Sequence, residues 1–262
     1  MHITFVLKNQ CNMKYIMEVK NLSYSVNKKQ ILNDVTAQFT EGKITAIIGP
    51  NGSGKSTLMS FLSKTRKSAN TVFFRGKDVN DISARDYSFQ VSVLPQQQKI
   101  NADFKVEDVV IMGRFPYKKQ FCDYTKEDRR IAQDSMKRVG IENMATRRLS
   151  QMSGGEIQRV MIAKALAQEP ELILMDEPTN HLDVKYKVAL METLRSYGKT
   201  VIVVLHDLSL AVQYCDDAVI MVDGQVFKQG NTRDIMQADM LESVFGVPFV
   251  KFEHNNRIYI NY

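Results

Sequence analysis

The sequence has few of the residues that mark secreted, fibrous or low-complexity chains. It holds only three cysteines, six prolines and 13 glycines among 262 residues. The cysteines, Cys11, Cys122 and Cys215, lie far apart, so neither a zinc knuckle nor a disulfide framework is predicted. Cysteine usage of this kind fits a reducing cytosol.

Long apolar runs are missing as well. The longest aliphatic stretch near a motif, Val201–Leu205, is far shorter than the roughly 20 residues that a membrane-spanning helix needs. At the amino terminus Ile3–Leu7 is apolar, but the polar segment Lys8–Lys14 follows it without a small-residue cleavage site, which argues against a secretory signal. We expect residues 1–16 to form an N-terminal extension outside the folded domain.

The charge is moderately basic but is not concentrated. Hydrophobic residues make up 44% and charged residues 24%, which is ordinary for a soluble globular chain of one large or two small domains. The net charge of +6 favours acidic partners such as nucleotides, anionic lipid or nucleic acid. The strongest basic clusters are only pairs, Arg129–Arg130 and Arg147–Arg148, so a basic solvated surface is the favoured interpretation.

The hydrophobic pattern predicts an α/β core interrupted by a helical segment. Alternating strands are expected at Glu18–Val26 and around Ile31–Phe39, and a helical pattern from about residue 101 to residue 168. Near-continuous aliphatic runs, typical of parallel strands buried on both faces, follow later in the chain at Leu172–Met175, Thr200–Leu205 and Ala218–Val222. Asp223-Gly224 predicts a hairpin turn, and no internal repeat is present.

A glycine-rich segment between an aliphatic strand and a helix fits the P-loop pattern. Its glycines let the backbone wrap a phosphate, its lysine supplies a cation for the β- and γ-phosphates, and the following serine offers a hydroxyl to Mg²⁺. A chance glycine turn is the weaker alternative, because the preceding strand and the Gly-Lys-Ser-Thr ending are both present. The candidate nucleotide-binding residues are Gly49, Pro50, Asn51, Gly52, Ser53, Gly54, Lys55, Ser56 and Thr57.

Polar residues at strand ends supply the candidate catalytic groups. Asp176 ends the run Leu172–Met175 and is predicted to hold Mg²⁺, and Glu177 is predicted to act as the general base on the attacking water. A capping acid pair before Pro178 would be favoured for this dipeptide in a chain without a P-loop. His206 and Gln96 also follow strands, and Gln96 is a candidate contact to Mg²⁺ and the attacking water.

A second anion-binding helix start is predicted at Ser153-Gly154-Gly155-Glu156. A serine and two glycines at a helix N-terminus leave N–H groups exposed at the positive end of the helix dipole. A simple N-cap is the alternative. Because the chain carries two such helix starts but one P-loop, we expect the second to serve a nucleotide bound on another subunit.

In this order the motifs resemble those of the ATP-binding subunits of ABC transporters. The resemblance covers the chain from about Met17 to Gly230 and includes Walker A at Gly49–Thr57, the signature at Met152–Glu156 and Walker B at Leu172–Asp176. The remaining matches are the Q-loop glutamine Gln96, the catalytic Glu177, the D-loop Asn180-His181-Leu182-Asp183 and the switch histidine His206.

The resemblance implies a P-loop NTPase fold with a parallel sheet, an N-terminal antiparallel β region and an inserted α-helical subdomain. The expected ATPase domain is 17–238, with the helical subdomain at about 97–168 and a C-terminal appendix at 239–262. It also implies a head-to-tail dimer that clasps two ATP molecules with Mg²⁺ between Walker A of one copy and the signature and Asp183 of the other.

Two positions depart from the family pattern. The signature is usually Leu-Ser-Gly-Gly-Gln, whereas Met152 and Glu156 stand here, and activity is expected to survive because Ser153 and the glycines carry the phosphate contact. The usual adenine-stacking aromatic falls on Val26. Tyr24 lies two residues earlier, on the same expected strand face, and is the candidate for stacking on adenine. The alternative is that Tyr24 has only a structural role.

Shorter strings resemble the importer ATPases for iron-siderophores, haem or cobalamin, and manganese and zinc importers share much of the pattern. The strings are Val93–Gln96, Gly113–Tyr117 and Thr179–Asp183. The resemblance implies a peripheral subunit at the cytoplasmic face of the membrane, bound to a permease and indirectly to an extracytoplasmic solute-binding protein. Arg114 and Tyr117 are the expected permease contacts.

A soluble ABC ATPase acting on ribosomes or DNA is the alternative from a different class. Such proteins usually carry two cassettes or long coiled-coil insertions, and this sequence has neither, so no nucleic-acid partner is expected.

Overall fold

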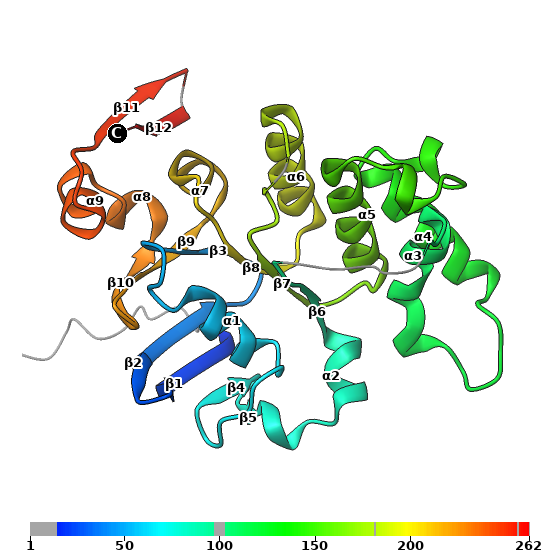
Figure 1. The fold of residues 1–262 in the computed structure, drawn as a ribbon, viewed down its shortest axis with the longest axis horizontal. Helices are drawn as coiled ribbons and strands as arrows, with labels where there is room; N and C mark the ends of the chain where they lie inside the picture. Colours follow the sequence, from blue (N-terminus) through cyan, green and yellow to red (C-terminus); the bar gives the residue numbers. More distant parts are fainter. Residues whose placement is uncertain (1–14, 97–102, 181, 256, 262) are drawn as a thin grey trace, which may run out of the picture.

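The computed structural model describes residues 15–96, 103–180, 182–255 and 257–261. Its centre is a six-stranded sheet in the order β10-β9-β3-β8-β7-β6, in which only β10 runs antiparallel to its neighbour. The strands are β3 (Ile44–Ile48), β6 (Val91–Leu94), β7 (Leu172–Asp176), β8 (Thr200–Val204), β9 (Asp217–Val222) and β10 (Gln225–Asn231). The N-terminal β3 therefore lies between two strands from the last quarter of the chain (Figure 1).

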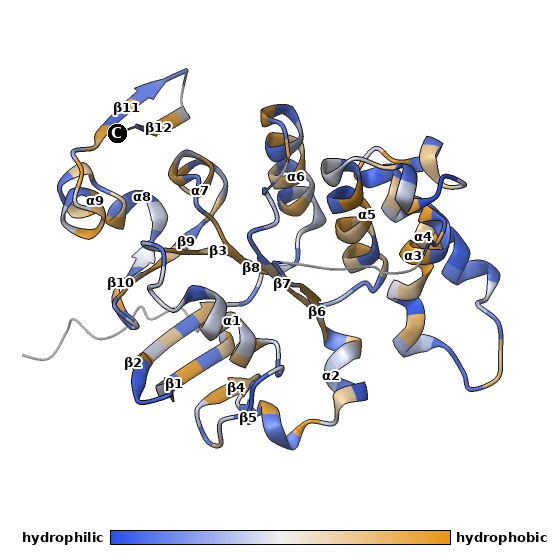
Figure 2. Ribbon diagram, viewed as in Figure 1, coloured by the Kyte–Doolittle hydropathy of each residue, from blue (hydrophilic) through white to orange (hydrophobic). Residues whose placement is uncertain are grey.

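The central strands are buried on both faces, as their aliphatic composition predicts. Along β7, Leu172 and Leu174 face one hydrophobic core while Ile173 and Met175 face another. Figure 2 shows these strands mainly in the hydrophobic colour. Such strands cannot tolerate a shift in register by one residue, because the shift would exchange the two cores.

An antiparallel sheet covers one face of the P-loop region. Its order is β2-β1-β4-β5, with β1 (Tyr15–Val26), β2 (Lys29–Thr40), β4 (Val72–Phe74) and β5 (Lys77–Asp78). β1 begins two residues before the predicted domain start at residue 17, because Tyr15 pairs with Thr40 and Ile16 is buried. Residues 1–14, including Cys11, lie outside the described residues. Helix α1 (Lys55–Leu62) packs between the two sheets (Figure 1).

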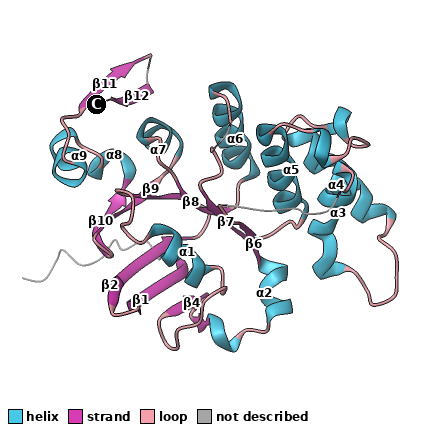
Figure 3. Cartoon of the chain, viewed as in Figure 1, coloured by secondary structure: helices cyan, strands magenta, loops and turns pink. Residues whose placement is uncertain are grey.

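Helices cover the opposite face of the central sheet and extend into the helical insert (Figure 3). The helices from α2 to α7 are α2 (Ala84–Gln90), α3 (Val106–Ile111), α4 (Lys126–Arg138), α5 (Gly154–Ala167), α6 (Val184–Tyr197) and α7 (Leu208–Tyr214). Helix α5 joins the insert to the sheet, since it packs on α3 and α4 and ends beside β6. Short 3₁₀ helices are η1 (Val79–Asp81), η2 (Met112–Tyr117), η3 (Glu142–Met144) and η4 (Leu149–Gln151).

The segment Gly113–Tyr117 is packed more deeply in the insert than the sequence suggests. Gly113 is close enough to α5 that a Cβ would meet Lys164 O at 2.3 Å. Arg114 is only 6% exposed, so the structure gives no support to the expectation that this side chain contacts a permease. Its guanidinium donates to Asp128 Oδ1 at 3.0 Å and to Glu169 Oε2 at 2.9 Å. It also lies 3.9 Å from the ring centre of Tyr117. Phe115 is instead the most exposed side chain of the segment, at 69%.

The predicted turn between β9 and β10 ties three distant segments together. Asp223 and Gly224 both have positive φ, 48° and 78°, as the tight hairpin requires. Gly224 N donates to Ser53 O at 3.2 Å, and Asn33 N donates to Gly224 O at 2.8 Å. A Cβ on Gly224 would meet Ile31 O at 2.4 Å, so only glycine allows this approach.

The C-terminal segment is built into the main core. It contains α8 (Thr232–Ile235), α9 (Ala238–Phe245), and a hairpin of β11 (Val250–His254) and β12 (Arg257–Asn261). Leu241 and Ile260 are buried in the core that covers α7. Ser209 Oγ donates to Ile260 O at 2.9 Å and accepts from Ile260 N at 3.0 Å, which fixes β12 on α7.

Candidate active site

The glycine-rich loop connects β3 to α1 where the sequence predicts it. Gly49 has φ of 149°, and a Cβ there would meet Met221 O at 2.1 Å. Gly54 has φ of 98° at the N-cap of α1, and a Cβ there would meet the Leu32 side chain at 2.7 Å. Both positions exclude a side chain, so the loop backbone is held tightly against the sheet with its helix N-terminus free.

Lys55 is folded back over the loop. Its ammonium donates to the carbonyl oxygens of Gly49 and Pro50, both at 2.8 Å. Burial lowers the pKa of Lys55, and the nearby Glu177 and Asp176 carboxylates oppose that shift. The backbone carbonyls of the loop therefore hold the lysine cation in a defined position over the loop.

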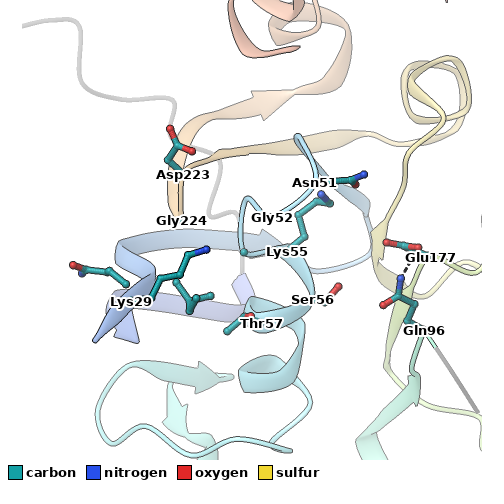
Figure 4. Close-up of a pocket in the computed structure, with 13 residues that line it drawn as sticks. Lys29, Asn51, Gly52, Lys55, Ser56, Thr57, Gln96, Glu177, Asp223 and Gly224 are labelled. Carbon is teal, nitrogen blue, oxygen red and sulfur yellow. Dashed lines mark hydrogen bonds between the residues drawn. The ribbon is translucent and has the colours of Figure 1, made fainter. Parts of the chain in front are cut away.

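A cavity of about 680 Å³ lies beside the loop (Figure 4). This size is in the range of nucleotide and other ligand pockets. The loop and α1 form its floor, and Gln96 and Glu177 stand at one end (Figure 4). The lining residues are Lys29, Gln30, Ile31, Asn51, Gly52, Gly54, Lys55, Ser56, Thr57, Gln96, Glu177, Asp223 and Gly224.

Ser56 and Asp176 bring two oxygen ligands together. Ser56 Oγ donates to Asp176 Oδ1 at 3.3 Å, which places the first turn of α1 against the end of β7. Burial raises the pKa of Asp176. In the described part of the chain, no group of three or more His, Cys, Asp or Glu side chains is arranged so that it could hold a metal ion by itself. A hydroxyl and a carboxylate fit Mg²⁺, which usually takes few protein ligands and completes its shell with water and substrate phosphates.

Glu177 is held by three side chains. His206 Nε2 lies 2.7 Å from Oε1, while Gln96 Nε2 and Asn180 Nδ2 donate to Oε2 at 2.8 and 2.5 Å. Glu177 is 8% exposed. Burial acts to raise its pKa, but the three hydrogen bonds outweigh burial, so its pKa lies below the usual range. The backbone at Glu177 has φ of 53°, a strained conformation of the kind often found at functional positions.

Parallel strand ends bring these side chains to one edge of the sheet. Gln96 follows β6, Glu177 follows β7 and His206 follows β8, three adjacent strands. The contact of Asn180 with Glu177 is not among the predicted catalytic ones. Its side chain lies close to Glu177 because Asn180 N donates to Glu177 O at 3.2 Å in a tight turn. Pro178 followed by Thr179-Asn180 is the turn signal that predicts such a return.

The signature residues lie at the N-terminus of α5 and do not line this cavity. Ser153 is the N-cap, and its hydroxyl accepts from Glu156 N at 3.3 Å in a capping box. Asp183 caps α6, is exposed and is also absent from the cavity lining. His181 lies outside the described residues. The described residues thus place the phosphate loop at the cavity and the N-terminus of α5, with its capping box, away from it.

Tyr24 is not among the residues that line the cavity. Its ring packs edge-on against Phe61 at 5.2 Å between centroids, and its hydroxyl accepts from Arg66. Register shifts in β1 on both sides of Tyr24 break the two-residue alternation. Tyr24 therefore faces α1 while Val26 is 41% exposed, and the expectation that Tyr24 contacts the base is not supported.

Comparison with known proteins identifies the family. Residues 32–180 match the family described as ABC transporter. The chain belongs to the ABC transporter family. It is 34% identical to the iron(3+)-hydroxamate import ATP-binding protein FhuC of Bacillus subtilis, and the match covers 88% of each chain. It is 35% identical to the manganese transport system ATP-binding protein MntB of Halalkalibacterium halodurans, over 95% of this chain and 99% of the relative.

Solved structures of ABC proteins share the fold. A metal-chelate type ABC transporter in an inward-facing conformation superposes with a TM-score of 0.80 at 24% identity, over 95% of this chain and 96% of that one. The ATP-binding cassette MJ0796, solved as a dimer bound to ADP and Pi, superposes with a TM-score of 0.73 at 30% identity, over 83% and 99%.

These findings confirm the predicted fold class and the predicted family. The protein is an ABC ATPase subunit that binds nucleotide. The cavity beside the glycine-rich loop, with the polar cluster around Glu177 at one end, is the candidate site for that nucleotide. Among the described residues, no helix combines the length and apolarity needed to cross a bilayer.

Proposed function

We propose that this chain hydrolyses ATP to energise import of an iron-siderophore or related iron chelate through a separate membrane permease. The observation that supports hydrolysis most strongly is the ionised Glu177 carboxylate, held by Gln96, Asn180 and His206 at the end of the P-loop cavity. The proposal of an iron chelate as the cargo rests on similarity to ATP-binding proteins named for import of iron(3+)-hydroxamate, import of petrobactin and transport of ferric enterobactin.

The phosphates of ATP lie over the loop in this proposal. Backbone N–H groups of Gly52–Lys55 and the N-terminus of α1 surround the β- and γ-phosphates, and the Lys55 ammonium moves from Gly49 O and Pro50 O onto them. Ser56, Asp176 and Gln96 are the residues that would hold Mg²⁺. When bound, that ion neutralises phosphate charge.

Glu177 accepts the proton of the attacking water. Its lowered pKa keeps it ionised at neutral pH, and its three partners fix the direction of both carboxylate oxygens. His206 stands directly before Asp207, the N-cap of α7, so its contact with Glu177 connects the carboxylate to the start of that helix.

A second copy completes each site. The N-terminus of α5 does not reach the cavity of its own subunit, yet it offers a hydroxyl and exposed helix N–H groups suited to a γ-phosphate. Head-to-tail pairing would bring Ser153, Gly154, Gly155 and Glu156 of one copy to the ATP of the other, with Asp183 at the same boundary.

The permease and its solute-binding protein remain outside this chain. Phe115 is 69% exposed and Tyr117 37% exposed on the helical insert, which makes this surface the proposed permease contact. Such a contact would hold the subunit at the cytoplasmic face of the membrane. A manganese importer is the second candidate, because the MntB relative is covered over 99% of its length.

Two experiments test the proposal. The first is isolation of the subunit from membranes: a polytopic permease that co-purifies supports a transport role, whereas recovery with ribosomes or DNA would refute it. Uptake assays with labelled ferric siderophore and with Mn²⁺ then decide the cargo.

The second experiment mixes K55A and S153A subunits. The mixed dimer should regain about half of the composite sites, whereas each variant alone is inactive. Failure of mixed dimers to hydrolyse ATP would contradict shared sites.

A further inference from the structure

Glu156 stands at the signature where the family usually has an uncharged glutamine. Its carboxylate is bound to the residue that the signature offers to phosphate. Ser153 N donates to Glu156 Oε2 at 2.8 Å, and Ser153 Oγ donates to the same oxygen at 3.0 Å. The first donors of this helix start are therefore occupied by an anion that belongs to the same chain.

Arg147 holds the other oxygen of that carboxylate. Its guanidinium lies 3.2 Å from Glu156 Oε1 and donates to Gln151 O at 2.7 Å. The backbone of Arg147 is fixed as well, since Arg147 N bonds to Met144 O and Arg147 O accepts from Val106 N. The pKa of Glu156 lies below its usual range. The main cause is the hydrogen bond from the Ser153 backbone, followed by the one from its hydroxyl, and Arg147 adds to the effect.

The Ser153 hydroxyl has a single proton to donate. In this subunit that proton goes to Glu156, so a γ-phosphate can take it only if the carboxylate releases it. A phosphate and an ionised carboxylate within one helix turn also repel each other. Arg147 already contacts the carboxylate oxygen that Ser153 does not.

We propose that Glu156 acts as an internal competitor for the γ-phosphate of the partner copy's ATP, and that Arg147 receives the carboxylate when the phosphate displaces it from Ser153. Glu156 is a positioning residue in this scheme, because it acts through Ser153. The proposal rests on the ATP-sandwich dimer proposed above. Its consequence is that a higher concentration of ATP is needed to close the dimer, so the subunits stay apart when ATP is scarce.

Opposite changes at the two residues separate this role from simple helix capping. E156Q keeps the shape and an amide oxygen for Ser153 N but removes the charge, so ATP should close the dimer more easily. R147Q leaves the carboxylate without its alternative partner, so closure should become harder. If Glu156 and Arg147 only stabilise the start of α5, both substitutions weaken the cap and both impair closure.

The experiment uses the full chain with E177Q, so that ATP is not consumed, and follows the monomer–dimer equilibrium by sedimentation against the concentration of Mg·ATP. We expect E156Q to lower the ATP concentration at half-dimerisation about tenfold, equivalent to about 1.4 kcal/mol, and R147Q to raise it by a similar factor. R148Q is the matched control, since the Arg148 guanidinium pairs with Asp103 Oδ2 at 3.1 Å rather than with Glu156.

A second measurement isolates the effect from nucleotide binding itself. At protein concentrations where the chain is monomeric, affinity for a fluorescent ATP analogue should be the same in all variants, because neither Glu156 nor Arg147 lines the cavity. Equal dimerisation of E156Q and its parent, or a shift of E156Q and R147Q in the same direction, overturns the proposal alone. A parent that does not dimerise with ATP refutes the sandwich and the competitor together.

Discussion

Replacing Arg114 with alanine should destabilise the helical insert rather than remove a docking residue. The guanidinium is buried, and it makes ion pairs with Asp128 and Glu169 and a hydrogen bond to Ala167 O at 3.0 Å. Loss of one partner of a buried ion pair typically costs about 3–5 kcal/mol. Asp128 Oδ2 keeps its hydrogen bonds from Thr125, and Glu169 is half-exposed, so we expect the lower end, about 3 kcal/mol.

Arg130 provides a matched control on the neighbouring helix. It also pairs with two carboxylates, Glu127 and Asp134, but all three side chains are exposed. R130A should therefore leave the stability close to that of the parent. Urea unfolding followed by far-ultraviolet circular dichroism suits this chain, which has no tryptophan.

The comparison also tests the permease assignment. If R114A unfolds at the parent's urea midpoint but abolishes transport, the buried role derived from the structure is wrong and Arg114 is a docking residue after all. F115A removes the exposed ring beside it, so that variant should retain the parent's stability while transport falls.

The other predictions concern the nucleotide site and the insert. K55A should weaken ATP binding by more than about tenfold, because the phosphates lose a charge-assisted contact; equilibrium binding measures this. E177Q should retain ATP binding while turnover falls at least about 100-fold in a phosphate-release assay. Y24L should leave the KM for ATP unchanged, because Tyr24 packs on Phe61. For Asp128, burial acts to raise the pKa, but hydrogen bonds from Thr125 and Arg114 hold it below its usual range. The stability that this carboxylate adds is present above the unfolded-state pKa and is lost as pH falls through the folded value, so the stability gap between the parent and D128N should narrow below about pH 4 in urea titrations.

Local signals in the sequence predict most of the site. Buried strands are nearly uniform aliphatic runs, and Gln96, Asp176, Glu177 and His206 each stand just beyond one, so parallel pairing alone brings them to one edge. The P-loop is equally local, because its glycines and Lys55 are contiguous.

What the sequence does not reveal depends on distant partners or broken alternation. The burial of Arg114 requires Asp128 and Glu169, the second of which is 55 residues away, and no local pattern announces that pairing. The prediction that Tyr24 shares a strand face with Val26 assumes regular two-residue alternation, and register shifts on both sides of Tyr24 break that alternation in β1. Ser153 and Glu156 fit the Ser-x-x-Glu pattern of a capping box, but the pattern does not specify the ion pair of Glu156 with Arg147, nine residues away.

The turn at Asp223-Gly224 has a consequence for how the chain is made. It clamps Ser53 of the phosphate loop and Asn33 of β2, and β3 pairs with β8 and β9 on its two sides. The ribosome therefore delivers the loop early, but the contacts that fix it emerge some 170 residues later, in the order expected for vectorial synthesis. A nascent chain that extends past Asp176 but has not reached Gly224 carries both Walker motifs and still lacks the hydrogen bond from Gly224 N to Ser53 O that ties the phosphate loop to this turn.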